Sequence, residues 1–88
     1  MSTFQVDEVT ATTDASGYLT HSFTNNIDKV VAGPNQPQSG SGAGILGASA
    51  VVTGAKSVNV RCWEADGSGG VRTCQSKQVT VTLLGITG

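Results

Sequence analysis

The residues of this 88-residue chain with the greatest capacity for chemistry are the cysteines Cys62 and Cys74 and a single histidine, His21. Two thiols can form a disulfide, and thiols together with imidazole can bind zinc. A closed zinc site needs four clustered ligands, which two cysteines and one distant histidine do not supply, so we expect no metal and no other cofactor. His21 stands beside Ser22 in an alternating segment, where we expect a packed or solvated strand residue and not a general base.

The two cysteines are placed symmetrically about a predicted chain reversal at residues 66–70. If Ser68 is the centre of this reversal, residues that face each other across the hairpin have numbers that sum to 136, as those of Cys62 and Cys74 do. Directly opposed residues of an antiparallel pair have Cα atoms about 4.5 to 5.5 Å apart, which is within the range that a disulfide accepts. Two alternatives stay open, a cross-strand disulfide and two buried thiols that pack as small apolar residues.

No pattern of catalytic residues is visible in the rest of the sequence. The carboxylates are scattered among turns and strand ends, and no two of them form an acid–base pair: Asp7, Glu8, Asp14, Asp28, Glu64 and Asp66. Gly40, Gly42 and Gly44 imitate part of a phosphate-binding loop, but no helix is predicted after them and no Lys-Ser/Thr pair closes the motif. We therefore predict that the protein is not an enzyme.

Residues 57–65 carry the candidate contact groups. Strand alternation separates a core face with Val58, Val60 and Cys62 from an outer face with Asn59, Arg61 and Trp63. An aromatic ring, a guanidinium and an amide are the groups that dock a sugar ring or anchor a protein interface. The alternative is structural, with Trp63 packed in a second apolar layer and Arg61 stacked on its ring.

Strands must position these groups, because Thr, Ser, Gly and Val are abundant, Lys, Glu and Leu are sparse, and no segment has a helical apolar period. Six extended segments are predicted, at residues 4–12, 18–23, 29–32, 45–53, 57–65 and 78–84. In the first of them the apolar alternation slips at Asp7 and Glu8, which predicts a β-bulge. The expected fold class is all-β, a small antiparallel β-sandwich of about six strands that forms one domain over residues 1–88.

A Gly/Ser/Pro-rich loop is predicted at residues 33–44. The apolar side chains of this segment are limited to proline and Ala43, so the segment cannot contribute to a packed core. It is either a surface loop or an arm that lies across a neighbouring subunit. Asn35 and Gln36 in this loop are further candidates for glycan contact.

Charge and length limit the partners. A formal net charge of -1 with 12% charged residues leaves no basic stripe for phosphates, so we expect no nucleic-acid partner. No apolar run is long enough for a bilayer span and no signal peptide is recognisable, so we expect no membrane partner. A chain of this length has a thin core, and oligomerisation is expected, because an interface that buries a few hundred Å² at about 25 cal/mol per Å² adds several kcal/mol.

Three blocks of the sequence, residues 9–21, 58–67 and 79–86, carry a resemblance to a known family. Together they resemble the small H-type-lectin-like β-sandwich modules of virion proteins from bacteriophages that infect actinobacteria, which often stand at the ends of minor tail proteins. The resemblance implies a six-stranded antiparallel sandwich that is commonly trimeric and is exposed on the surface of a phage particle. The polar and aromatic groups that bind sugar in true H-type lectins have no clear counterparts on the loops here.

The module makes up nearly the whole chain, beginning at a plausible initiator Met1, and in this respect the chain resembles a capsid decoration protein. The first functional expectation is therefore a structural virion protein, a homotrimer on the capsid surface that binds the major capsid protein through residues 1–6 and 33–44. The alternative is a minor tail or fibre component that binds host-surface glycans. Its contact residues would be Arg61 and Trp63, or Asn35 and Gln36.

Overall fold

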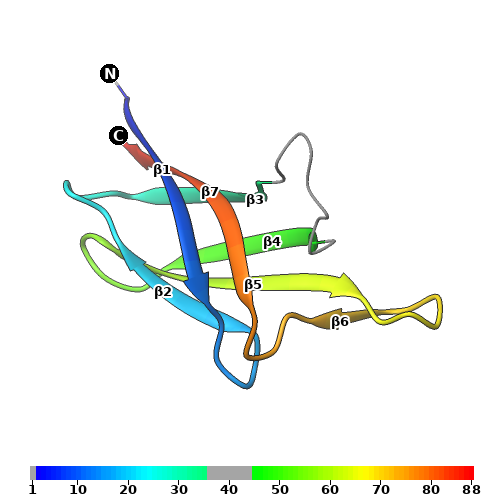
Figure 1. Cartoon of the computed structure of the whole chain (residues 1–88). Helices are drawn as coiled ribbons and strands as arrows, with labels where there is room; N and C mark the ends of the chain where they lie inside the picture. The colour runs from blue at the N-terminus through cyan, green and yellow to red at the C-terminus, as the bar shows by residue number, and fades with distance from the viewer. Residues whose placement is uncertain (1, 36–44) are drawn as a thin grey trace.

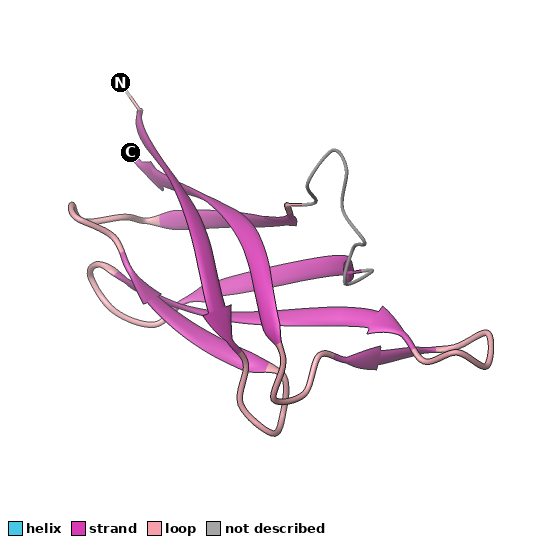
Figure 2. Cartoon of the chain, in the orientation of Figure 1, coloured by secondary structure: helices cyan, strands magenta, loops and turns pink. Residues whose placement is uncertain are grey.

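The computed structural model describes residues 2–35 and 45–88, which form seven β-strands and no helix (Figures 1 and 2). The strands are β1 (Thr3–Thr12), β2 (Tyr18–Ser22), β3 (Lys29–Pro34), β4 (Ile45–Val52), β5 (Ser57–Ala65), β6 (Val71–Thr73) and β7 (Gln78–Thr87). One antiparallel sheet has the order β1-β7-β3, and the other has the order β2-β5-β4, with β6 paired to the end of β5. The predicted all-β antiparallel sandwich is confirmed. None of the described residues forms a helix able to cross a membrane.

Six strands were predicted, and the additional strand in the structure is β6. It has three residues, Val71–Thr73, and pairs with Trp63, Glu64 and Ala65 at the end of β5. Three residues are too few to establish an alternation, and the side chain of Arg72 gives no apolar signal. In Figure 1 the β5–β6 hairpin projects from the molecule at the end opposite the two termini.

The predicted bulge in the first strand is wrong. β1 pairs with β7 in an unbroken register from Thr3 opposite Thr87 to Thr12 opposite Gln78. The apolar residues change face instead, because Val9 and Ala11 pack against the core while Phe4 and Val6 are 62% and 67% exposed on the outer face. The slip in the pattern therefore marks a strand with apolar groups on both sides.

The core lies between the two sheets and is built largely by their central strands. Its fully buried members are Val79, Val81 and Leu83 of β7, Val58, Val60 and Cys62 of β5, and Cys74. The predicted core face of β5 is thus confirmed. These residues are mostly Val and Leu, whose burial is worth about 1.5–3 kcal/mol per side chain.

The two sheets contact each other in a different way at each side of the sandwich. On one side β3 runs alongside β4. On the other side His21 of β2 reaches across to β1, where its Nε2 atom lies 2.6 Å from the Asp7 carboxylate, and its ring packs edge-on against Phe23. His21 is therefore a packed residue that links the two sheets.

Two turns use the same device, an aspartate that binds the backbone of its own loop. One carboxylate oxygen accepts hydrogen bonds from backbone N–H groups two and four residues further on: Ser16 and Tyr18 for Asp14, and Ser68 and Gly70 for Asp66. These bonds hold the pKa of both carboxyls below the ordinary value, with the largest contributions from Tyr18 and Ser68. A glycine with positive φ completes each turn.

Candidate functional site

The candidate site is the outer face of the sheet β2-β5-β4. Arg61 lies at its centre, directly between Tyr18 of β2 and Ser49 of β4 in the strand register. Trp63 and Asn59 flank Arg61 along β5 on the same side of the sheet, because alternate residues of a strand share one face. We call the surface of Tyr18, Asn59, Arg61 and Trp63 the aromatic–arginine face. The predicted outer position of the three β5 residues is confirmed.

The Arg61 guanidinium is held between two aromatic rings. Its central carbon lies 4.8 Å from the centroid of the Tyr18 ring and 5.9 Å from that of the Trp63 ring. Both distances are within the range of cation–π attraction, which restrains the side chain. The Nε atom of Arg61 is buried and has no hydrogen-bond partner among the residues that the structure describes. A buried charged donor without an acceptor is energetically costly.

Two hollows lie beside Tyr18 and Asn59. One, of about 300 Å³, is lined by Tyr18, Ser49, Ala50, Val51, Asn59, Arg61 and Trp63. The other, of about 340 Å³, is lined by Ala11, Thr12, Asp14, Tyr18, Leu19, Thr20 and Asn59. Tyr18 and Asn59 belong to both hollows, and the second hollow extends to Ala11 and Thr12 of β1 in the other sheet. Aromatic rings, hydroxyls, an amide and a carboxylate line the two hollows.

Asn35, another predicted contact residue, does not lie on this face. Asn35 follows β3 on the opposite sheet, where its N–H donates to the carbonyl of Thr80 at 3.1 Å. Gln36 lies outside the described residues. The structure therefore does not bring Asn35 onto the aromatic–arginine face. In its place it brings Tyr18, which the sequence did not indicate because β2 and β5 are far apart in the chain.

The cysteines have the predicted register. Trp63 faces Thr73, a pair whose numbers sum to 136, and the N–H of Cys74 donates to the carbonyl of Cys62 at 3.0 Å. Both are buried free thiols, which corresponds to the packed-thiol alternative. Burial, with a smaller contribution from Cys74, raises the pKa of Cys62 to about 11. Burial is also the main cause of the raised pKa of Cys74. The protonated thiol is the unreactive form.

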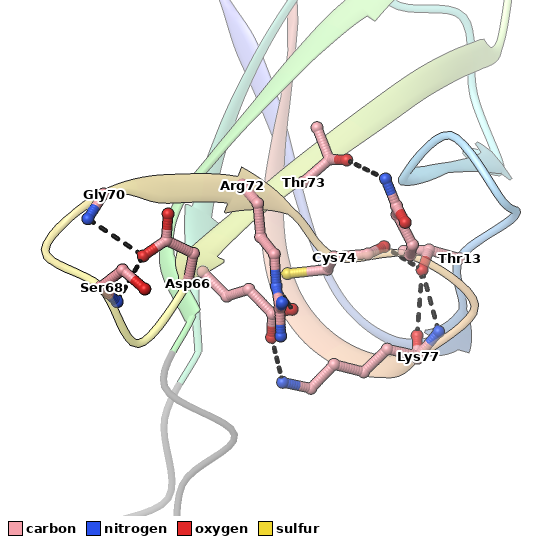
Figure 3. A network of polar contacts seen from close by, with 10 residues as sticks. Thr13, Asp66, Ser68, Gly70, Arg72, Thr73, Cys74 and Lys77 are labelled. Atoms are coloured by element: carbon pink, nitrogen blue, oxygen red, sulfur yellow. Dashed lines mark hydrogen bonds and ion pairs between the residues drawn. The ribbon is translucent and has the colours of Figure 1, made fainter.

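Next to the thiols, a polar network closes the end of the core (Figure 3). Glu64 is on the core face of β5, and its carboxylate accepts from Arg72 Nε at 3.0 Å and from Lys77 Nζ. Hydrogen bonds from Lys77 first, and then from Arg72, lower the pKa of the Glu64 carboxyl. The buried hydroxyl of Thr13 meets the carbonyls of Cys74 and Lys77 and accepts from the Lys77 N–H. This network fixes the loop between β6 and β7.

The fold and the aromatic–arginine face define a small all-β protein with a candidate contact surface. Within the described part of the chain, no group of three or more His, Cys, Asp or Glu side chains is arranged to hold a metal ion. No protein-family model, curated protein or solved structure matches the chain.

Proposed function

We propose that the protein is a structural component of a bacteriophage virion, a decoration protein that binds the capsid surface as an oligomer. The observation that carries this proposal is the aromatic–arginine face, where Arg61 is held between Tyr18 and Trp63. Trp, Tyr and Arg are the residue types that most often dominate the binding energy of protein interfaces. The resemblance to virion modules supports the setting, with the major capsid protein as the partner.

The geometry also indicates what the partner supplies. A carboxylate of the partner is attracted to the positive charge of the Arg61 guanidinium. Apolar partner groups cover the exposed parts of the Tyr18 and Trp63 rings and exclude water from that contact. Because the rings already restrain the guanidinium, little side-chain entropy is lost when the partner binds.

The test is rebinding of the purified protein to virions from which it has been removed. We expect Arg61→Ala and Trp63→Ala each to weaken binding by at least about tenfold, as is typical of residues at the centre of an interface. The exposed cation Lys56, which lies outside this face, provides the control, and Lys56→Ala should bind as the wild type does. Undiminished binding of both Arg61→Ala and Trp63→Ala would exclude this face as the docking site.

A second candidate function, glycan binding by a minor tail or fibre component, is favoured by the paired hollows. Sugar rings stack on aromatic faces, and their hydroxyls pair with amide, hydroxyl and carboxylate groups. Tyr18 stands between the two hollows, and Asn59 lines both of them. This arrangement fits two neighbouring sugar residues of a host-surface glycan.

A glycan array tests the second candidate. We expect binding of the wild type to a host-surface oligosaccharide and loss of that binding in Tyr18→Ala and Trp63→Ala. Lys56→Ala changes an exposed side chain that lines neither hollow and should retain binding. Binding that persists in both Tyr18→Ala and Trp63→Ala would place the site elsewhere, and no binding by the wild type would remove this candidate.

A further inference from the structure

The outer face of the other sheet, β1-β7-β3, carries an apolar patch. Cross-strand register places five large side chains next to one another: Phe4 and Val6 of β1, Leu84 and Ile86 of β7, and Val31 of β3. Phe4, Val6 and Val31 are each more than half exposed, whereas Leu84 and Ile86 are partly covered by them. The largest apolar patch on a soluble protein is often functional, which makes this surface a candidate for association. We call these five residues the apolar patch.

Two opposite charges stand at diagonal corners of the apolar patch. In the register Phe4, Ile86 and Lys29 form one row across the sheet, Val6, Leu84 and Val31 the next, and Glu8, Thr82 and Gly33 the third. Leu84 is therefore at the centre, with Glu8 and Lys29 at opposite corners. Both charged side chains are exposed, and neither has an ion-pair partner within residues 2–35 and 45–88.

We infer that this face binds a second copy of the same chain through a two-fold axis at Leu84. An axis that lies in the interface and is perpendicular to the line from Glu8 to Lys29 sets Glu8 of each copy against Lys29 of the other. The same operation brings Val6 near Ile86 of the second copy and Phe4 beside its counterpart. The patch is thus complementary to itself in both charge and hydrophobicity, which is the requirement for an isologous dimer.

The strands of the two copies cross steeply in this arrangement, as in orthogonal packing of sheets. Beyond Glu8 the outer face becomes polar, and the hydroxyls of Thr10 and Thr80 satisfy each other at 3.0 Å. The apolar contact is therefore confined to the end of the sheet near the two termini, which lie side by side in Figure 1. This inference concerns the opposite side of the sandwich from the aromatic–arginine face and does not rest on the virion proposal.

The size of the face sets the strength of the dimer. The three rows cover five residues on each of three strands, which at about 4.8 Å between strands and about 3.3 Å per residue is an area of roughly 250 Å². Two copies bury about 500 Å², well below the roughly 1,000 Å² that a stable specific interface exceeds. We therefore expect a weak, reversible dimer with a dissociation constant on the order of 100 μM.

Sedimentation of the full chain over a concentration series tests the dimer. The wild type should pass from monomer to dimer, and Val6→Asp should abolish the transition by placing a charge in the apolar patch. Val71→Asp is the matched control, because Val71 is 59% exposed on β6 at a distance from this face, and it should dimerise as the wild type does. A wild type that stays monomeric to several hundred micromolar, or that forms only trimers, would overturn the inference.

Charge exchange tests the two-fold pairing itself. Glu8→Lys alone and Lys29→Glu alone should each raise the dissociation constant at least tenfold, because each places like charges opposite one another. The double variant Glu8→Lys/Lys29→Glu should restore dimerisation, and an equimolar mixture of the two single variants should form a heterodimer. Dimers that are indifferent to these changes would show that Glu8 and Lys29 do not face each other. Loss of virion or glycan binding in these variants is not required, so this test and those of the proposed function fail independently.

Discussion

Replacing Leu83 with alanine is expected to lower the free energy of unfolding by about 2–5 kcal/mol, as Leu→Ala changes do in fully buried positions. Leu83 has no exposed surface and lies in the middle of β7, the central strand of its sheet, between Asp7 of β1 and Ala32 of β3. A domain of this size has a total stability near the low end of about 5–15 kcal/mol. The variant should therefore lose a large share of its stability, with a Tm roughly 10–30 °C lower.

Thermal and urea unfolding followed by circular dichroism measure this effect, at equal protein concentration so that self-association contributes equally. Leu46→Ala is the matched control, because the same atoms are removed from a side chain that is 58% exposed on β4. It should change the free energy of unfolding by less than about 0.5 kcal/mol. Equal losses in the two variants would mean that β7 does not form the centre of the core.

The faces of β5 were predicted correctly because its core side carries Val58, Val60 and Cys62 whereas its outer side carries Asn59 and Arg61. β5 alternates without a break from Val58 to Glu64, so its core and outer faces follow from the sequence. β1 misled the prediction, because Phe4 and Val6 belong to the outer apolar patch and Val9 and Ala11 to the core. A two-residue period predicts which residues share a face but does not tell which face is buried. A change of face therefore looks the same as an inserted residue.

The candidate site was predicted in part for a similar reason. Arg61 and Trp63 are two residues apart in one strand, and their common orientation is a local property of the chain. Tyr18 completes the site only through the pairing of β2 with β5, in which it faces Arg61 across 43 positions of sequence. Such pairings depend on the global topology, which local patterns do not encode. Asn35 was proposed only because it belongs to the predicted polar loop. Its N–H donates to Thr80 of β7, which places it on the other sheet.

Acid should weaken the protein through Glu64. Its side chain is 11% exposed and accepts hydrogen bonds from Arg72 and Lys77, which hold its pKa below the ordinary value of 4.5. A folded-state pKa below that of the unfolded chain gives stability that is fully present above the unfolded value and is lost as the pH falls through the folded value. The contribution of Glu64 to the stability of the wild type should therefore be constant from pH 7 to about pH 5. It should decrease below about pH 4.5.

Glu64→Gln removes the charge while keeping the size of the side chain, and at pH 7 it should lower the free energy of unfolding by about 1–2 kcal/mol. This value is below the cost of breaking a fully buried pair, because Arg72 is 59% exposed and water screens its charge. The difference from the wild type should shrink as the pH falls through the lowered folded-state pKa of Glu64, since the protonated carboxyl is neutral, as the Gln side chain is. Urea unfolding from pH 3 to 7 at low protein concentration measures this difference in the free energy of unfolding. Glu8→Gln, at an exposed glutamate, is the control. A loss that is the same at pH 3 and pH 7 would show that the ion pairs of Glu64 do not stabilise the fold.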